Sequence, residues 1–116
     1  MHEITSTFQR RPAYRYIRKT DRLPTYDQLD EEDGHTFETI VCSVKLFNPT
    51  GAGTWWIAAF DPDTEIAWGV AEIHCREIGS FSIRELAEYR GQFGLPIERD
   101  LHFRPATIAD ILAKAD

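Results

Sequence analysis

The densest group of polar side chains that could do chemistry lies near the C-terminus, in the run Glu98-Arg99-Asp100 with His102 close behind. On a strand, the two carboxylates and His102 would share one face while Arg99 points to the other. Two carboxylates and an imidazole are residue types of an acid/base group or a metal site. The interpretation that we favour is structural: Arg99 pins the helix expected at 82–90 or a loop carbonyl, and the carboxylates stay in solvent.

A zinc site can also be written from thiolate and imidazole ligands. Its members would be Cys42, His74, Cys75 and His102. The spacing does not support it, because there is no Cys-x-x-Cys or His-x-x-x-His motif, and neighbouring residues on a strand point to opposite faces. The chain also lacks a Gly-x-Ser-x-Gly elbow and a phosphate-binding loop. We therefore predict no metal and no cofactor, and we interpret both cysteines as reduced core residues.

The first twenty residues form a basic arm in which charges alternate with aromatic side chains. Five basic residues oppose one acid there, a balance of +4. Because guanidinium groups suit phosphate contacts and aromatic rings suit base stacking, the arm is a candidate nucleic-acid site. The residues in question are Arg10, Arg11, Tyr14, Arg15, Tyr16, Arg18 and Lys19, with Trp55 as a further platform if no helix covers it. Alternatively, the arm is an edge strand or folds back on the acidic stretch that follows.

The acidic stretch covers residues 21–38 and carries a balance of −6, within a chain of net charge −6. An acidic chain with a pI near 5.1 is a poor general partner for nucleic acid. We therefore interpret the protein as a non-enzymatic binding protein that acts through protein–protein contacts, with 27–38 as a docking surface or a solvated loop. Nucleic-acid binding by the arm is the alternative, and a small enzyme using Glu98, Asp100 and His102 is a weaker one.

Length and composition describe one ordinary domain. The chain has 116 residues, of which 42% are hydrophobic, enough for a core without disulfides or metal. No apolar run approaches the ~18 residues that span a bilayer, and the start lacks the pattern of a signal peptide. We predict a cytoplasmic protein without membrane contact. Its oligomeric state stays open, because a small sheet leaves edges that a second copy could pair.

Apolar residues alternate at 39–47 and 65–74, and the segment 54–60 between them is apolar on both faces, which predicts three consecutive antiparallel strands with a central one at 54–60. A further strand is expected at 97–103. Ser82 followed by Glu85 predicts a helix over 82–90 that ends at Gly91 in a left-handed conformation. A last helix is expected to begin near Thr107. It would bury Ile108, Ile111, Leu112 and Ala115.

These elements together predict the α+β class. We expect a small antiparallel meander sheet of three to four strands with two short helices over 39–116. Residues 1–38, the basic arm and then the acidic stretch, are expected to be partly irregular.

Four pieces of the chain, at 44–49, 54–55, 79–86 and 90–103, carry a family resemblance. Over about 44–103 the sequence resembles a family of small bacterial proteins classed as a domain of unknown function, number 2958. The resemblance implies no activity. It implies a plasmid or mobile-element context, with an accessory role in DNA maintenance, transfer or evasion of host defence. Residues 1–38 do not resemble the family's usual N-terminal segment, so we expect the arm to be particular to this protein.

If the basic arm binds nucleic acid, replacing Arg10, Arg11, Arg15 and Arg18 by alanine should abolish binding to labelled single-stranded and duplex DNA. Binding by the unaltered chain should weaken steeply as salt rises, because each phosphate contact releases counterions. A salt titration measures both effects. The absence of any DNA shift at low salt would contradict the prediction.

Overall fold

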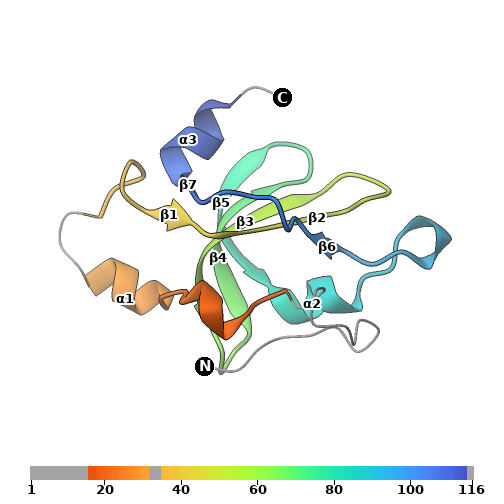
Figure 1. Cartoon of the computed structure of the whole chain (residues 1–116), viewed down its shortest axis with the longest axis horizontal. Helices are drawn as coiled ribbons and strands as arrows, with labels where there is room; N and C mark the ends of the chain where they lie inside the picture. The colour runs from red at the N-terminus through yellow and green to blue at the C-terminus, as the bar shows by residue number, and fades with distance from the viewer. Residues whose placement is uncertain (1–15, 32–34, 115–116) are drawn as a thin grey trace.

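A computed structural model describes residues 16–31 and 35–114, and its centre is a five-stranded antiparallel sheet in the order β5-β4-β3-β2-β6 (Figure 1). The strands are β2 (Val44–Phe47), β3 (Thr54–Asp61), β4 (Ile66–Glu72), β5 (Arg76–Ser82) and β6 (Glu98–Arg99). A separate ladder pairs β1 (Val41–Cys42) with β7 (Ala106–Thr107). The helices are α1 (Tyr26–Glu31), α2 (Ile83–Glu88) and α3 (Ile108–Ala113), with 3-10 turns at Lys19–Asp21 and Gln92–Gly94. The predicted α+β class is confirmed, with more strands than expected.

The two faces of the sheet are covered by different parts of the chain, which we call the α2 face and the α3 face. β3 is buried on both sides from Trp55 to Phe60, as its unbroken apolar run predicts for a central strand. On the α2 face the core includes Tyr16, Ile17, Leu46, Trp55, Ile57, Ile83 and Ile97. On the α3 face it includes Ile40, Cys42, Trp56, Ala58, Val70, Ile108 and Ile111. Residues that neighbour each other on β3 therefore belong to opposite cores.

Helix α2 begins where the sequence predicts and ends earlier. Ser82 accepts a hydrogen bond from the Glu85 N–H at 3.1 Å, which confirms the N-cap. The helix ends at Glu88, and Gly91 has a φ of −92°, so the predicted left-handed stop at Gly91 is wrong. Glycine at position 91 instead lets the backbone lie close to Thr50, since a Cβ there would be 2.8 Å from the Thr50 hydroxyl.

Helix α3 also starts at its predicted cap, because Thr107 accepts a hydrogen bond from the Asp110 N–H at 3.1 Å. Ile108 and Ile111 are buried as expected, but Leu112 is 38% exposed. A helix of only six residues buries one narrow face, here that of Ile108 and Ile111, and Leu112 lies outside this face. Ala115 lies outside the described residues. The structure contains no described helix that could cross a membrane.

Three strand predictions are wrong in their bounds. The segment expected at 39–47 is divided at Ser43 into β1 and β2, which belong to different sheets. The segment expected at 65–74 ends at Glu72, and β5 follows after a turn at 73–75. β5 was missed because its run, Arg-Glu-Ile-Gly-Ser-Phe-Ser, shows little apolar alternation, as is common for an edge strand. The strand expected at 97–103 ends at Arg99, because Asp100 turns the chain by accepting a hydrogen bond from the His102 N–H at 2.9 Å.

The acidic stretch contains a helix that the prediction of an irregular N-terminal third did not include. Thr25 and Gln28 form a reciprocal cap: the Thr25 N–H donates to the Gln28 side chain at 2.8 Å, and the Gln28 N–H donates to the Thr25 hydroxyl at 3.2 Å. Helix α1 then packs on the sheet through Tyr26, whose ring lies edge-on to Trp68 with centroids 5.3 Å apart.

The chain just before α1 is held to β6 by a buried ion pair. Arg99 donates to both carboxylate oxygens of Asp21, at 2.8 and 2.7 Å, and to the Tyr16 carbonyl at 3.0 Å. The two side chains are only 11% and 9% exposed. Tyr16 adds a hydrogen bond from its hydroxyl to the Ile97 carbonyl at 2.6 Å. Arg99 is thus structural, and it holds the N-terminal segment and a loop carbonyl rather than α2.

Replacing Asp21 by alanine should lower the free energy of unfolding by about 3 kcal/mol, because it leaves the Arg99 charge buried without its partner. Urea unfolding followed by tryptophan fluorescence measures the change. Arg104→Ala, at an exposed position, is the control and should change stability by less than about 0.5 kcal/mol. Equal effects of the two variants would contradict the importance of the buried pair.

Candidate binding groove

A groove of about 580 Å³ lies on the α3 face, where the hairpin turn between β2 and β3 meets the turn between β4 and β5. We call it the hairpin groove. Its apolar contacts come from Phe47, Trp56 and Ile73, and its polar rim includes Lys45, Glu72 and Asp100. None of the described residues of α3 lines it. Its dimensions fall within the range of ligand sites in proteins.

Strand geometry explains why these side chains meet. Lys45 and Phe47 alternate with buried Val44 and Leu46 on β2, so they point to the α3 face. Lys45 lies opposite Trp56 in the β2–β3 register, and both therefore belong to the same side of the sheet. The alternation of Lys45 and Phe47 with Val44 and Leu46 is the sequence signal that places them on this face.

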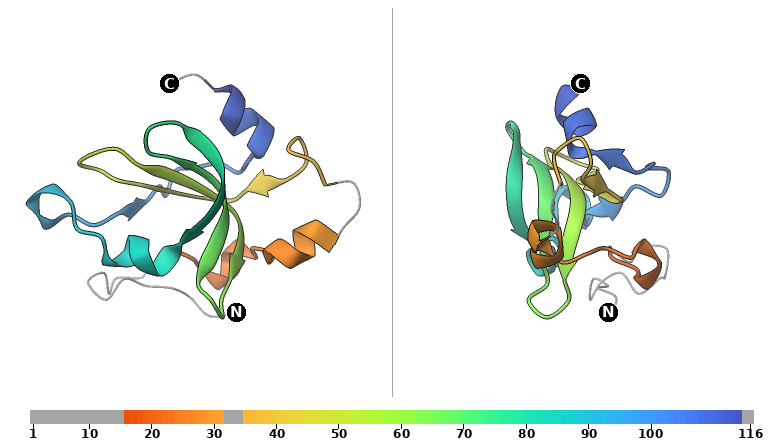
Figure 2. Two further views of the ribbon diagram at one scale, coloured as in Figure 1. Left: turned by 180° about the vertical axis from the view of Figure 1, so that it is seen from behind. Right: turned by 90° about the vertical axis from the view of Figure 1, so that its left-hand side faces the viewer.

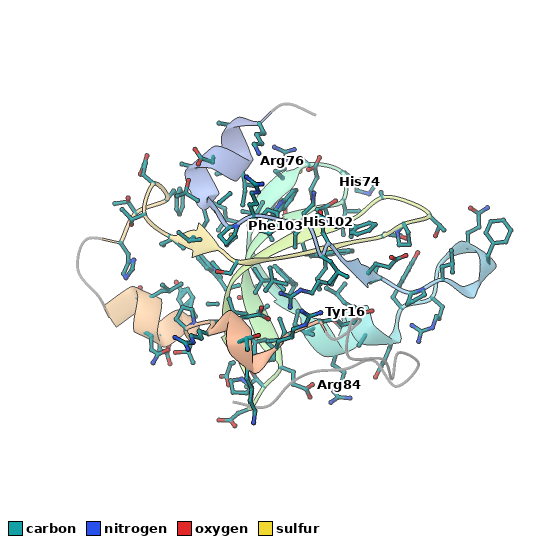
Figure 3. All side chains as sticks on the ribbon, in the orientation of Figure 1. Tyr16, His74, Arg76, Arg84, His102 and Phe103 are labelled. Carbon is teal, nitrogen blue, oxygen red and sulfur yellow. The ribbon has the colours of Figure 1, made fainter. Side chains whose placement is uncertain are left out.

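The charged groups around the groove are held in ion pairs. Lys45 Nζ lies 3.7 Å from Asp100 Oδ2, and the Asp100 N–H donates to the Lys45 carbonyl at 2.9 Å. Arg76 Nε lies 2.7 Å from Glu72 Oε1. Arg76 also donates through Nη1 to the Ile111 carbonyl at 2.5 Å and to the Lys114 carbonyl, which ties β5 to the end of α3 (Figure 3).

Trp56 lies between the two cations. Lys45 Nζ is 5.8 Å from the centroid of its ring, and Arg76 Cζ is 5.5 Å from it. Such contacts favour a cation over the face of an indole. The ring itself is only 8% exposed. The Trp56 ring therefore helps to position the two ion pairs, and little of it is accessible to a ligand.

The hairpin turn that forms one wall is rigidly built. Asn48 donates to the Ala52 carbonyl at 3.2 Å and to the Tyr89 hydroxyl at 3.3 Å, and its side-chain oxygen accepts from the Thr50 N–H. Gly53 has a φ of +130°, and a Cβ there would lie 2.6 Å from the Trp55 ring. The turn thus requires glycine at this position and is linked to the end of α2.

The residues expected to form an acid/base group do not come together. Glu98 lies opposite Phe47 and Arg99 opposite Leu46, so the predicted opposite facing of these two is confirmed. Because the strand ends at Arg99, His102 lies in an exposed turn rather than in register with Glu98. Among Glu98, Asp100 and His102, only Asp100 lines the hairpin groove.

Some of the nucleic-acid candidates lie within the described residues, and the others lie outside them. Tyr16 is fully buried and Trp55 is 7% exposed in the core on the α2 face, so neither ring is placed to stack on a base. Of the basic residues, Arg18 is half-buried and Lys19 is exposed. Four candidates lie outside the described residues: Arg10, Arg11, Tyr14 and Arg15.

The two cysteines differ in environment. Cys42 is buried, and desolvation raises the pKa of its thiol to about 12, as befits a reduced core residue. Cys75 is exposed in the turn after β4, so its prediction as a core residue is wrong. His74 and His102 are exposed as well. Within residues 16–31 and 35–114, no three metal-binding side chains lie together.

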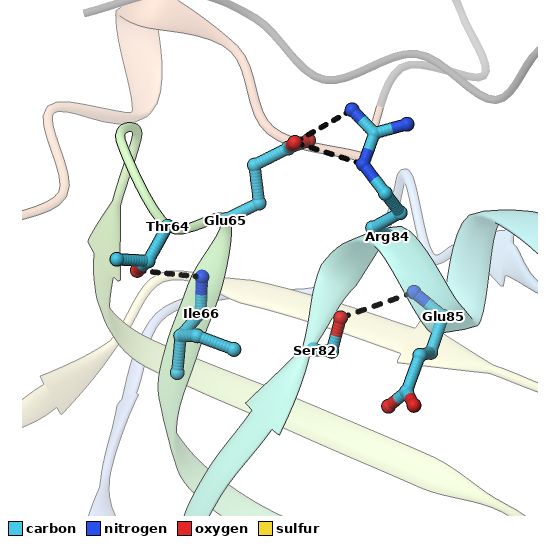
Figure 4. A network of polar contacts seen from close by, with 6 residues as sticks. All are labelled: Thr64, Glu65, Ile66, Ser82, Arg84 and Glu85. Atoms are coloured by element: carbon cyan, nitrogen blue, oxygen red, sulfur yellow. Dashed lines mark hydrogen bonds and ion pairs between the residues drawn. The ribbon is translucent and has the colours of Figure 1, made fainter.

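A second polar network joins the turn after β3 to helix α2 (Figure 4). Arg84 donates to one carboxylate oxygen of Glu65 through Nε at 2.9 Å and Nη2 at 2.6 Å, and the pair raises the pKa of Arg84. Glu65 has a φ of 61°, and its carbonyl accepts from the Ile83 N–H. Its other oxygen is buried without a partner among the described residues. We interpret this network as structural, because it holds a turn against a helix start.

Replacing Glu77 by glutamine should increase the alkylation rate of Cys75 by iodoacetamide severalfold near pH 8. The Cys75 thiol donates to the Glu77 carboxylate at 3.2 Å, and that hydrogen bond and the negative charge raise the pKa of the thiol. Removing the charge lowers this pKa and so increases the thiolate fraction. Cys42 should stay unmodified in both proteins. Unchanged Cys75 kinetics would contradict the assignment.

Comparison with known proteins places the chain in a family without an assigned activity. None of the curated proteins and none of the solved structures compared matches it. A family model described as "Protein of unknown function (DUF2958)" matches residues 19–116. The match includes Asp21 and the acidic stretch, so the expectation that all of 1–38 departs from the family is wrong from residue 19 onward. The chain therefore belongs to the DUF2958 family of proteins of unknown function.

Proposed function

We propose that the protein is a non-enzymatic binding protein that acts through protein–protein contacts, with the hairpin groove as its docking site. The observation that carries this proposal is the construction of the groove: a largely polar surface bordered by two ion pairs, with the exposed apolar side chain of Ile73 at its edge. Protein interfaces commonly combine an apolar anchor with a hydrogen-bonding polar surround.

Binding is favoured over catalysis because the charged groups are already committed to each other. Lys45 pairs with Asp100, and Arg76 pairs with Glu72 and with two carbonyls of α3. A general base or nucleophile needs a reacting group aimed at a common point in the site. The groove instead presents a preorganised polar rim, which suits recognition.

A protein segment is the ligand class that suits the groove best. Ile73 is 53% exposed at its edge, and Phe47 is half-buried beside it. Exposed apolar side chains gathered beside polar groups are typical of docking sites for a partner's apolar anchor.

The cellular setting is part of the proposal. The family resemblance suggests an accessory protein of a plasmid or another mobile element, acting in the cytoplasm. Nucleic-acid binding by the basic arm stays a prediction, since most of the arm lies outside the described residues. The burial of Tyr16 and Trp55 reduces the number of rings available for it. An enzyme based on Glu98, Asp100 and His102 is not supported by their separation.

A pull-down of the tagged full chain from its own host, with and without nuclease, tests the proposal. We expect a protein partner that survives nuclease, and we expect Ile73→Asp to reduce its recovery about tenfold, because a charge replaces an apolar anchor. The matched control is Leu101→Asp, since Leu101 is 54% exposed and does not line the groove.

Circular dichroism of both variants would show that they fold. Loss of the partner on nuclease treatment would instead support the nucleic-acid alternative. Equal recovery by the two variants would contradict docking in the hairpin groove.

A further inference from the structure

The outer edge of β5 is an unprotected strand edge. β5 pairs with β4 over all seven of its residues without a bulge, and it is the last strand on its side of the sheet (Figure 2). Outside that ladder, no backbone hydrogen bond between described residues involves 77–81. Edge strands of this length normally carry a device against pairing with another chain.

The opposite edge of the sheet has such a device, and β5 does not. β6 is only two residues long, follows Pro96, and leads directly into a turn. Within 77–81 there is no proline and no lysine, and the only charge is that of Glu77. The contrast indicates that the β5 edge is built to be paired.

Gly79 leaves open space on one face of β5. It lies in the middle of β5 opposite Gly69, its φ is not positive, and a Cβ added to it would meet no described atom within 4 Å. Gly69, by contrast, is required, since its Cβ would lie 2.0 Å from the Trp56 carbonyl. A glycine inside a strand weakens it. The space above the face of β5 at Gly79 is open among the described residues, so a larger side chain can be introduced there without a clash.

We propose that β5 pairs antiparallel with β5 of a second copy of this chain, centred on Gly79, so that the two sheets become one. In this register Ser80 lies opposite Ile78 of the second copy, on the α3 face. Ser80 borders a cavity of about 240 Å³ lined also by Ile66, Trp68 and Tyr26. Ile78 of one copy therefore lies beside Ser80 of the other copy and beside the cavity that Ser80 borders.

Charge also favours this register. Two chains with a net charge of −6 each repel one another, so an acidic pair at the contact would be costly. Centring on Gly79 puts Glu77 opposite Phe81 of the second copy and Arg76 opposite Ser82, so no like charges face each other. The contact would cover Ile66 and Tyr26, which are 39% and 46% exposed. A second copy in this register therefore meets β5 without a like-charge contact.

Sedimentation equilibrium of the full chain at about 100 μM tests the proposal, since dimers form by mass action. We expect twice the 13.4 kDa chain mass. Gly79→Lys and Ser80→Lys should each raise the dimer dissociation constant about tenfold or more. Gly79→Lys places two lysines directly opposite each other, and Ser80→Lys places a charge opposite Ile78 of the second copy. Ala52→Lys, an exposed position in the hairpin turn, is the matched control and should leave dimerisation unchanged.

A second measurement keeps the proposal falsifiable if a lysine variant fails to fold. Cα atoms directly opposite in an antiparallel pair lie within about 4.5–5.5 Å, which is disulfide range. Gly79→Cys in a Cys75→Ser background should cross-link to a dimer on mild oxidation, whereas Ala52→Cys should not.

A monomer at all concentrations, or a dimer that neither lysine variant weakens, would overturn the proposal. None of the hairpin groove's lining residues belongs to β5, so a monomeric chain that still binds its partner through Ile73 would refute only the dimer.

Discussion

The buried pair between Arg99 and Asp21 is the interaction on which the closed α2 face depends. A sheet with apolar side chains on both faces is stable only when each face is covered. Helix α2 is six residues long and covers part of its face, and the segment at Tyr16 and Ile17 covers the rest. Between Ile17 and α1 the described chain forms only a 3-10 turn at Lys19–Asp21, so local structure does little to hold this segment. A two-point contact from Arg99 in β6 supplies the attachment, and its near-complete burial makes the geometry specific.

On the α3 face, Arg76 likewise connects segments that are far apart in the sequence. Arg76 joins the start of β5 to the end of α3 and lies over Trp56. The groove beyond Trp56 therefore depends on contacts between segments far apart in the sequence. Both arginines act through planar guanidinium groups that bind several acceptors at once, which a lysine in either place could not do. The protein thus stabilises a small core with a few polar contacts at the ends of short elements.

Local sequence signals predicted several elements well, because each acts over a few residues. Ser82 and Thr107 begin their helices as expected, and the alternation in β2 and β4 with the apolar run of β3 between them predicted three paired strands. The Thr25 cap of α1 carried an equally local signal that was overlooked. The strand β5 carried almost none, because its apolar residues are few and its partner β4 determines its conformation. Cys75 was misplaced for a related reason: the strand before it ends two residues earlier than the alternation suggests.

The sequence by itself determined the α+β class, the starts of two helices and the opposite facing of Glu98 and Arg99. These follow from capping, periodicity and charge, which are properties of neighbouring residues. Only the tertiary structure decided that Arg99 meets Asp21, which lies 78 positions away, and that Asp100 meets Lys45. It also decided that Tyr16 and Trp55 are core residues. Such contacts depend on strand order and on which segment covers each face, and neither leaves a short-range pattern in the chain.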